Sequence, residues 1–283
     1  MKTPTVLGVF TILFLSSPSS SWVLPTLPIA PTSRVSPLFG WGPDPIWSQS
    51  PVSKLSVVNT DPDLASLSIT FDRAQEFTNG GQYVQVKPNA DSDDSLAYLA
   101  IRNSPAEAKE TKSLTFLVKK SDSTEYLFQN SIPKPLTVSQ PMGGGFPVKD
   151  ALDPYKSDFP VSQVLLVCTG TGVSPILSLI SSGDLEIGGG RSCKMYWGLS
   201  SRSEYSDGVL EEVRSAGVTA VPVYSNPVQN ERVGYVQNAL EEDGISVPRN
   251  TLVVMVGQRG MADAVKEIAK GANVQEDRVV SNF

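Results

Sequence analysis

The stretch VLLVCTGTGVSPILSLI, residues 164–180, restricts the fold of this chain more than any other. Val164–Val167 form an apolar run suited to a buried strand, and residues 173–180 have the spacing of a helix packed on a sheet. Gly170 and Gly172 between them lack Cβ atoms, so a ligand can approach the backbone closely. The following helix directs free N–H groups and its positive dipole end at the turn. The pattern favours a phosphate site, with packing as the alternative reason for the glycines.

The two halves of the chain differ in the periodicity of their apolar residues. Residues 53–146 are short alternating segments separated by Gly, Pro and polar clusters, which is typical of a small antiparallel barrel or sandwich. From Val161 onward, apolar strands alternate with amphipathic helical stretches, which indicates parallel βαβ units. We predict an antiparallel β-barrel over residues 51–150, followed by a doubly wound parallel α/β domain over residues 155–283.

Composition excludes several classes of chemistry. The 283 residues are enough for about two domains, and they include no histidine, which rules out Ser-His-Asp or Cys-His catalysis and argues against the usual metal sites. Cys168 and Cys193 are too few for a disulfide framework. Beyond residue 43 the chain has 21 basic and 29 acidic residues, a net charge of −8. That charge disfavours nucleic acid as the main partner.

The N-terminus has the features of a targeting leader. Residues 1–21 have a basic start at Lys2, a short apolar core and a small-residue stretch, as a signal peptide does. The following segment, 22–50, is rich in Ser, Thr and Pro and has the character of a transit peptide or linker. The two parts resemble the bipartite leader of proteins sent to secondary plastids, with Trp22 after the cleavage site. We expect a plastid location, with secretion as the alternative, and no membrane span in the mature chain.

Several motifs over residues 53–283 occur in a characteristic order: Gly81–Val86 (GQYVQV), Met142–Phe146 (MGGGF), Thr169–Pro175 (TGTGVSP), Val256–Met261 (VGQRGM) and the ending Ser281–Phe283. Together with a barrel followed by a doubly wound domain, this set resembles the ferredoxin–NADP reductase superfamily of flavoprotein oxidoreductases. The resemblance implies hydride transfer between a nicotinamide dinucleotide and FAD. The cofactor-binding residues that it implies are Thr169, Gly170, Thr171, Gly172 and Val173 at the pyrophosphate, Gly257 and Met261 at the nicotinamide, and Tyr98, Leu99, Ala100, Gly143, Gly144 and Gly145 at the flavin.

The residues that distinguish NADPH from NADH at the adenosine end are expected directly after the second strand of the α/β domain. Ser201 and Arg202 follow that strand, and a hydroxyl and a guanidinium there could bind a 2′-phosphate. The hexapeptide 197–202 has no acidic residue for a free ribose, so NADPH is favoured over NADH. A solvated surface Arg202 is the alternative, and NADH-dependent relatives also carry an Arg near this position.

The chain departs from the family pattern at the flavin. The family motif Arg-x-Tyr-Ser/Thr aligns with Ala97, Leu99 and Ala100, so the phosphate-binding Arg and the ring-stacking Tyr are both replaced. Each loss is expected to cost on the order of 1–3 kcal/mol of binding energy. Tyr98 or Arg102 could substitute from neighbouring positions. Val256 also replaces the Cys that many relatives have beside the nicotinamide.

Two function classes follow from these observations. The first is a flavin-dependent oxidoreductase that moves electrons between NADPH and an unidentified acceptor; the acidic mature chain disfavours acidic ferredoxin as that acceptor. The second is a catalytically weak protein of the same fold that binds the nucleotide as a redox sensor or accessory subunit. A third interpretation, an electron-transfer subunit like that of dihydroorotate dehydrogenase, is nearly excluded. Such a subunit needs cysteines for an iron–sulfur cluster, and none follows Cys193.

Overall fold

The structure is a computed structural model that describes residues 44–57, 62–92, 95–129, 134–155, 159–202, 207–227 and 231–282. All of these belong to one compact unit, Gly40–Phe283. The predicted signal peptide, 1–21, and most of the transit-like segment, 22–50, lie outside the described residues. Among the residues that are described, no helix has the length and apolar character needed to cross a bilayer.

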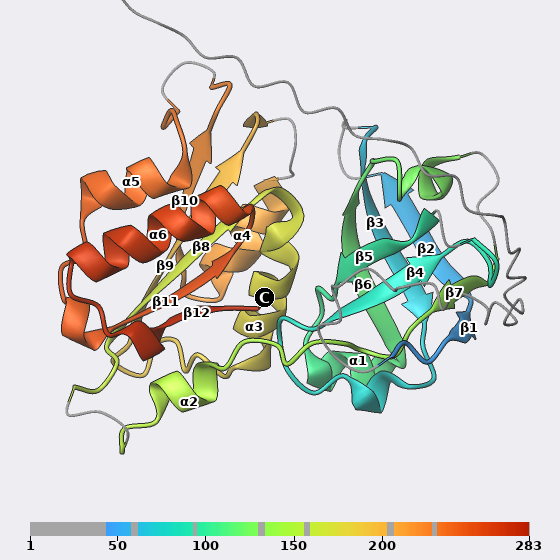
Figure 1. Cartoon of the computed structure of the whole chain (residues 1–283), viewed down its shortest axis with the longest axis horizontal. Coiled ribbons are helices and arrows are strands. Elements are labelled where there is room, and N and C mark those ends of the chain that lie inside the picture. The colour runs from blue at the N-terminus through green and yellow to red at the C-terminus, as the bar shows by residue number, and fades with distance from the viewer. Residues whose placement is uncertain are drawn as a thin grey trace, which may run out of the picture. The chain divides into compact units, whose positions relative to one another are not determined.

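Two antiparallel sheets make up the N-terminal half (Figure 1). The first has the order β1-β7-β4-β5, with bounds Ser48–Ser50, Leu136–Val138, Tyr83–Lys87 and Ala97–Ala100. The second has the order β2-β3-β6, with bounds Val52–Val57, Leu64–Thr70 and Ser113–Lys119. Alternate side chains of these strands enter a common core that includes Leu67, Ile69, Val84, Val86, Leu114 and Phe116. Strand β1 lies inside the predicted transit-like segment, so the folded part begins before the predicted boundary at residue 51.

The expected barrel is not closed. Strand β5 ends at Ala100, and the chain soon turns into helix α1 (Pro105–Thr111), which Ser104 caps by accepting a hydrogen bond from the Glu107 N–H at 3.2 Å. The Arg102 N–H donates to the Thr115 carbonyl at 2.8 Å, but no strand ladder joins the two sheets within the described parts of the chain. The antiparallel half is therefore a pair of packed sheets with an open seam beside β5, because β5 leaves its sheet before it can pair with β6.

A five-stranded parallel sheet forms the C-terminal half, as predicted. Its order is β10-β9-β8-β11-β12, with bounds Thr219–Tyr224, Ser192–Leu199, Gln163–Thr169, Thr251–Val256 and Val279–Ser281. Helices α3 (Val173–Ser182) and α4 (Asp207–Ser215) pack in the core on one face, and α5 (Val236–Asp243) and α6 (Arg259–Gly271) pack on the other. A short helix, α2 (Val148–Leu152), precedes β8 (Figure 1). The sheet order reverses at β8, so the carboxyl ends of β8, β9 and β11 border a topological switch point.

Helix α3 also packs against the antiparallel half. The Ser178 hydroxyl donates to the Asn103 carbonyl at 2.8 Å, and Arg102 forms an ion pair with Glu212 of α4. A Cβ added to Gly80 would lie only 2.9 Å from the Leu179 Cα, so the two backbones are in close contact. These contacts hold the second half of α3 and helix α4 against the turn at Gly80 and the segment that follows β5.

Candidate functional site

The glycine turn lies between β8 and α3, as the sequence predicts. Gly170 has φ of +52°, a left-handed conformation that glycine adopts without strain. The Val173 N–H donates to the carbonyls of Gly170 and Thr171, and the Val173 side chain is fully buried. Val173 is therefore part of the turn's internal bonding, whereas Gly170, Thr171 and Gly172 line cavities on the two sides of the turn.

Close packing against the end of β11 explains why glycines stand near this turn. A Cβ on Gly172 would lie 3.1 Å from the Val256 carbonyl oxygen, and one on Gly257 would lie 2.6 Å from the Thr169 hydroxyl and 2.5 Å from the Met261 methyl. Side chains at these positions would push β8 and β11 apart. The predicted residues Thr169, Gly172, Gly257 and Met261 are thus brought together at one edge of the sheet.

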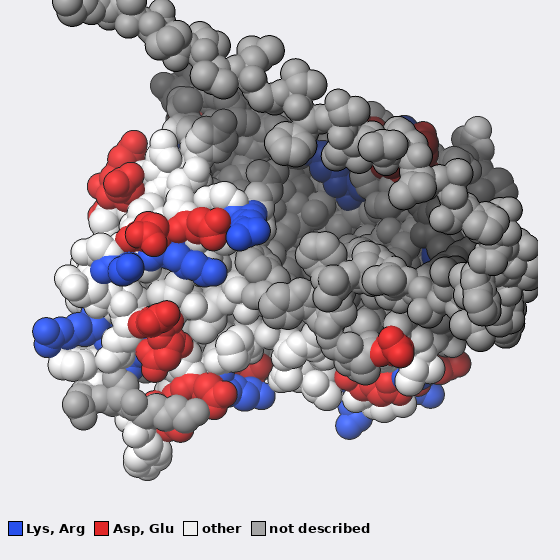
Figure 2. All heavy atoms as spheres, viewed as in Figure 1, with Lys and Arg blue, Asp and Glu red and all other residues white. Residues whose placement is uncertain are grey.

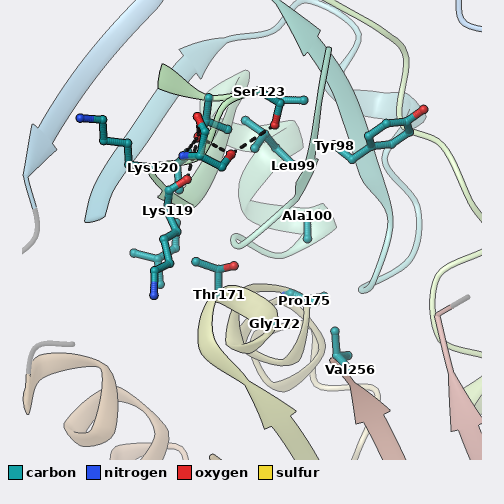
Figure 3. Close-up of a pocket in the computed structure, with 15 residues that line it drawn as sticks. Tyr98, Leu99, Ala100, Lys119, Lys120, Ser123, Thr171, Gly172, Pro175 and Val256 are labelled. Carbon is teal, nitrogen blue, oxygen red and sulfur yellow. Dashed lines mark hydrogen bonds between the residues drawn. The ribbon is translucent and has the colours of Figure 1, made fainter. Parts of the chain in front are cut away.

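The first cavity, which we call the interdomain cavity, has a volume of about 370 Å³. Its walls come from β5, from the end of β6 with the loop after it, and from the turn and the end of β11. Figure 3 shows β5 and the β6 loop facing Thr171, Gly172 and Pro175 across it, with Val256 at one side. The predicted residues Tyr98, Leu99 and Ala100 all line this cavity.

These three residues present different surfaces. Leu99 is buried in the core between the sheets, and Ala100 points toward the turn in Figure 3. The Tyr98 side chain is 62% exposed, points away from Lys119 and Lys120 in Figure 3, and lies beside Tyr83 with ring centroids 5.9 Å apart. Arg102, the other residue expected to substitute for the family's flavin-binding groups, instead forms an ion pair with Glu212. Tyr98 is thus an aromatic residue at the rim, while Arg102 does not line the cavity.

Sequence analysis missed the polar end of the interdomain cavity. This end is lined by Lys119, the last residue of β6, and by four residues of the loop that follows: Lys120, Ser121, Ser123 and Thr124. The buried Thr124 hydroxyl donates to the Lys119 carbonyl at 2.7 Å and accepts from the Ser121 N–H at 2.9 Å, which holds the loop in shape. Two cations and several hydroxyls form a chemically suitable anion site. The signal in the sequence was the run KKSDST immediately after an apolar strand.

The second cavity, which we call the sheet-edge cavity, measures about 480 Å³ and lies at the carboxyl ends of β8, β9 and β10 and the start of α6. Its wall includes the predicted residues Thr169, Gly170 and Met261, together with Ser200, Ser225, Tyr235, Gln237 and Gln258. The Tyr235 side chain is 63% exposed and is available for stacking. Among the described lining residues, none is charged.

Ser201 and Arg202 lie just outside this cavity. Neither is among the described residues that line it, although their neighbour Ser200 is, and Arg202 is exposed. The residues missed here, Ser225 and Tyr235, flank a loop without hydrophobic periodicity. Their only sequence signal was an isolated Gly-Tyr pair ahead of a helix.

The structure does not bring Gly143, Gly144 and Gly145 to either cavity, within the described part of the chain. They pack instead against the turn 78–83, where the Gln82 amide donates to the Gly143 carbonyl at 2.9 Å. Gly145 has φ of +71°, and an added Cβ would lie 2.7 Å from the Gly80 carbonyl oxygen. These glycines shape a tight crossing of two loops.

An ion-pair network supports one wall of the sheet-edge cavity. Asp243, at the end of α5, accepts hydrogen bonds from Lys194 at 2.5 Å and from the Tyr196 hydroxyl at 2.7 Å, and it pairs with Arg232 at 2.9 Å. These partners, Arg232 first, hold the pKa of the Asp243 carboxyl well below its usual range. Arg232 directly precedes the segment that carries Tyr235, so the network ties that segment to β9 and α5.

The two cysteines are structural. Both are buried, and burial raises the pKa of the Cys168 thiol far above its ordinary value and that of Cys193 to about 12. At neutral pH both remain protonated and unreactive.

Comparison with known proteins agrees with this geometry. Residues 166–267 match a family model described as the oxidoreductase NAD-binding domain. No curated protein sequence matches the chain. Among solved structures, a ferredoxin NADP+ reductase from Neisseria gonorrhoeae with bound FAD and NADP is 12% identical, with a TM-score of 0.62 over 84% of this chain and 99% of that one.

Two further structures show the same fold. The CS-b5R domains of human Ncb5or, in an NAD+ form, are 16% identical, with a TM-score of 0.67 over 85% of this chain and 70% of that one. A ferredoxin-NADP+ reductase from Plasmodium falciparum with 2′P-AMP is 13% identical, with a TM-score of 0.61 over 81% of this chain and 95% of that one. Structural similarity at identities this low shows a shared fold, which confirms the predicted order of an antiparallel β half followed by a parallel α/β half.

Proposed function

We propose that the chain is a flavin-dependent oxidoreductase that moves electrons from NADPH, by way of FAD, to an unidentified acceptor. One observation carries this proposal: the two cavities share a wall. Gly170 lines the sheet-edge cavity, whereas Thr171 and Gly172 line the interdomain cavity. Val256, at the end of β11, borders the interdomain cavity, and Met261, in the first turn of α6, borders the sheet-edge cavity. A ligand in each cavity would therefore meet the other at this turn.

The residues of the interdomain cavity fit a flavin. Leu99, Ala100, Pro175 and Val256 offer apolar walls to a planar ring, and the β6 loop offers cations and hydroxyls to a phosphate. A bound flavin supplies the ability to accept a hydride and to pass on electrons singly. Lys119 and Lys120 take over the charge that the family's Arg would bring at Ala97, which supports retained flavin binding.

The chain's own contribution is to bind and orient. Thr171 and Gly172 present backbone to the interdomain cavity, and the contact of Gly172 with Val256 brings the two strand ends close. Pro175 and Val256 add apolar surface that excludes water from the meeting point of the two cavities. Hydride transfer needs this kind of fixed, dry approach of two reacting rings.

The sheet-edge cavity suits the rest of a dinucleotide. Tyr235 offers a face for the adenine, and Ser200, Ser225 and Gln237 offer neutral hydrogen-bonding groups to ribose. Exposed Arg202 lies two residues beyond Ser200, and we assign it to the 2′-phosphate that distinguishes NADPH from NADH. Residues 1–43 support a plastid location, and the acidic mature chain supports an acceptor other than an acidic ferredoxin.

A second function is favoured by Ala97 and Leu99, which lack the family's flavin-binding groups. In that case the chain binds only the nucleotide and acts as a redox sensor or accessory subunit. Calorimetric titration of the full chain with FAD, NADPH and NADH separates the two functions. Binding of FAD and NADPH supports the oxidoreductase, and binding of the nucleotides alone supports the sensor. Absence of binding by all three ligands overturns both.

A further inference from the structure

Trp197 lies directly beneath the glycine turn. It belongs to β9, is fully buried, and is among the largest completely buried side chains of the described residues. The register of β8 and β9 places it opposite Cys168, one residue before the turn begins. Its indole N–H donates a hydrogen bond to the Gly170 carbonyl at 3.0 Å. A side chain of the core thus bonds directly to the backbone of the candidate site.

This bond has a geometric consequence for the next residue. In a trans peptide the C=O and the following N–H point in opposite directions. The indole and the Val173 N–H both hold the Gly170 carbonyl, so it points into the protein. The Thr171 N–H of the same peptide must then point away from Trp197. Gly170 lines the sheet-edge cavity and Thr171 lines the interdomain cavity, so the Gly170–Thr171 peptide lies in the wall that the two cavities share, with this N–H turned outward toward the ligands.

We propose that Trp197 is a positioning residue that fixes the Gly170–Thr171 peptide so that the Thr171 N–H binds the pyrophosphate of the nicotinamide dinucleotide. The inference rests on the proposed function, since it assigns a partner to the same turn. A tryptophan that only filled the core would affect all ligands alike. A residue that sets one peptide affects only ligands that carry the pyrophosphate.

The test compares Trp197→Phe, which keeps an aromatic ring but loses the indole N–H, with Trp47→Phe as the matched control. Both are made in the full chain, and NMR titrations measure the affinity of ADP-ribose and of adenosine, which has no phosphate. We expect Trp197→Phe to weaken ADP-ribose binding about five- to tenfold and to leave adenosine binding unchanged. Trp47→Phe, whose indole lies beside Lys87, should change neither affinity.

The outcomes separate this inference from the proposed function. If the unmodified chain binds no ADP-ribose, the proposed function fails, and this inference fails with it. If the unmodified chain binds ADP-ribose and Trp197→Phe binds it equally well, or loses both ligands equally, the positioning role alone is overturned. Should Trp197→Phe not fold, the Thr171 amide resonance of the unmodified chain decides. A shift of that resonance together with the Trp197 indole N–H resonance on adding ADP-ribose, and of neither on adding adenosine, supports the inference. A Thr171 shift with an unmoved indole resonance, or no shift at all, overturns it.

Discussion

At the scale of single residues, the proposed flavin site depends on Lys119 and Lys120. Ala97 stands where the motif of the superfamily that the chain resembles has a phosphate-binding Arg, and it is buried. The two lysines approach the same cavity from β6, on the adjacent sheet. Lys120 is exposed, and its ion pair with Glu125 is long, at 4.0 Å, so it contributes little to folding and can bind a phosphate instead.

Lys120→Met is therefore expected to weaken FAD binding about five- to tenfold at low salt. Riboflavin has no phosphate, so its affinity should not change. Fluorescence titrations with both ligands measure the difference, which should shrink as salt is added. Lys54→Met, on an exposed position of β2, is the control and should leave both affinities unaltered. Equal losses for FAD and riboflavin would argue against a phosphate at this end of the cavity.

At the scale of elements, the ends of strands and helices build the site. The network around Asp243 joins the end of α5 to β9 and to Arg232, and it supports the segment that carries Tyr235. The Asp243 and Lys194 side chains are 26% and 31% exposed, so solvent screens the network in part. The network therefore contributes modestly to the free energy of unfolding, but it holds a loop that borders the sheet-edge cavity.

Asp243→Asn should lower the free energy of unfolding at pH 7 by about 1 kcal/mol, as measured by urea denaturation. The pKa of Asp243 is lowered by folding, so its contribution is present above the unfolded value of about 4 and is lost as pH falls below that value. The difference between the two proteins should accordingly shrink in acid. Glu241→Gln, two residues away on α5, is the control with no expected effect. A pH-independent difference would show that the charge of Asp243 is not its cause.

The elements of the α/β half could be predicted because each follows from a local pattern. Strands β8 and β11 are apolar runs, and α6 is strongly amphipathic, with charged side chains over its outward face in Figure 2, so none of the three depends on distant residues for recognition. Strand β1 could not be predicted, since it has only three residues and its partner β7 lies about 90 residues away. The open seam beside β5 is likewise a property of sheet pairing, which strand patterns do not encode.

Site residues divide in the same way. The turn Thr169–Gly172 was predictable, because a strand, a glycine turn and a helix are contiguous. Lys120 and Tyr235 were missed, since their loops reach the cavities only through the packing of distant segments. Gly143–Gly145 were predicted at the flavin and instead contact the turn 78–83. The sequence could not separate the two cases, because glycines suit both a ligand site and a tight crossing of loops.

At the scale of the whole molecule, the two halves must hold two cavities in contact. One close contact is between backbones, where Gly80 meets Leu179 of α3. The Ser178–Asn103 hydrogen bond and the Arg102–Glu212 ion pair lie at the same junction. Because α3 takes part in this junction and directly follows the glycine turn, any shift of α3 also moves the shared wall of the cavities.

Gly80→Ala tests this coupling. The added Cβ would lie 2.9 Å from the Leu179 Cα and 3.0 Å from its nitrogen, so the halves must separate slightly. We expect flavin reduction by NADPH, followed by stopped flow, to slow about tenfold or more, while the affinities for FAD and NADPH measured singly change little. Gly144→Ala is the matched control, since nothing lies within 4 Å of a Cβ there. Unaltered reduction in Gly80→Ala would show that the junction does not set the approach of the two ligands.

The central claim is that the two cavities form one active site, and a single spectrum tests it most directly. The full chain is mixed with FAD, freed of excess flavin, and its visible absorption is recorded under anaerobic conditions before and after NADPH is added. The account predicts a protein-bound flavin spectrum that bleaches on addition of NADPH. A protein that retains no flavin, or retains it without bleaching, would contradict the claim that the turn at Thr169–Gly172 joins the two cavities in one reaction.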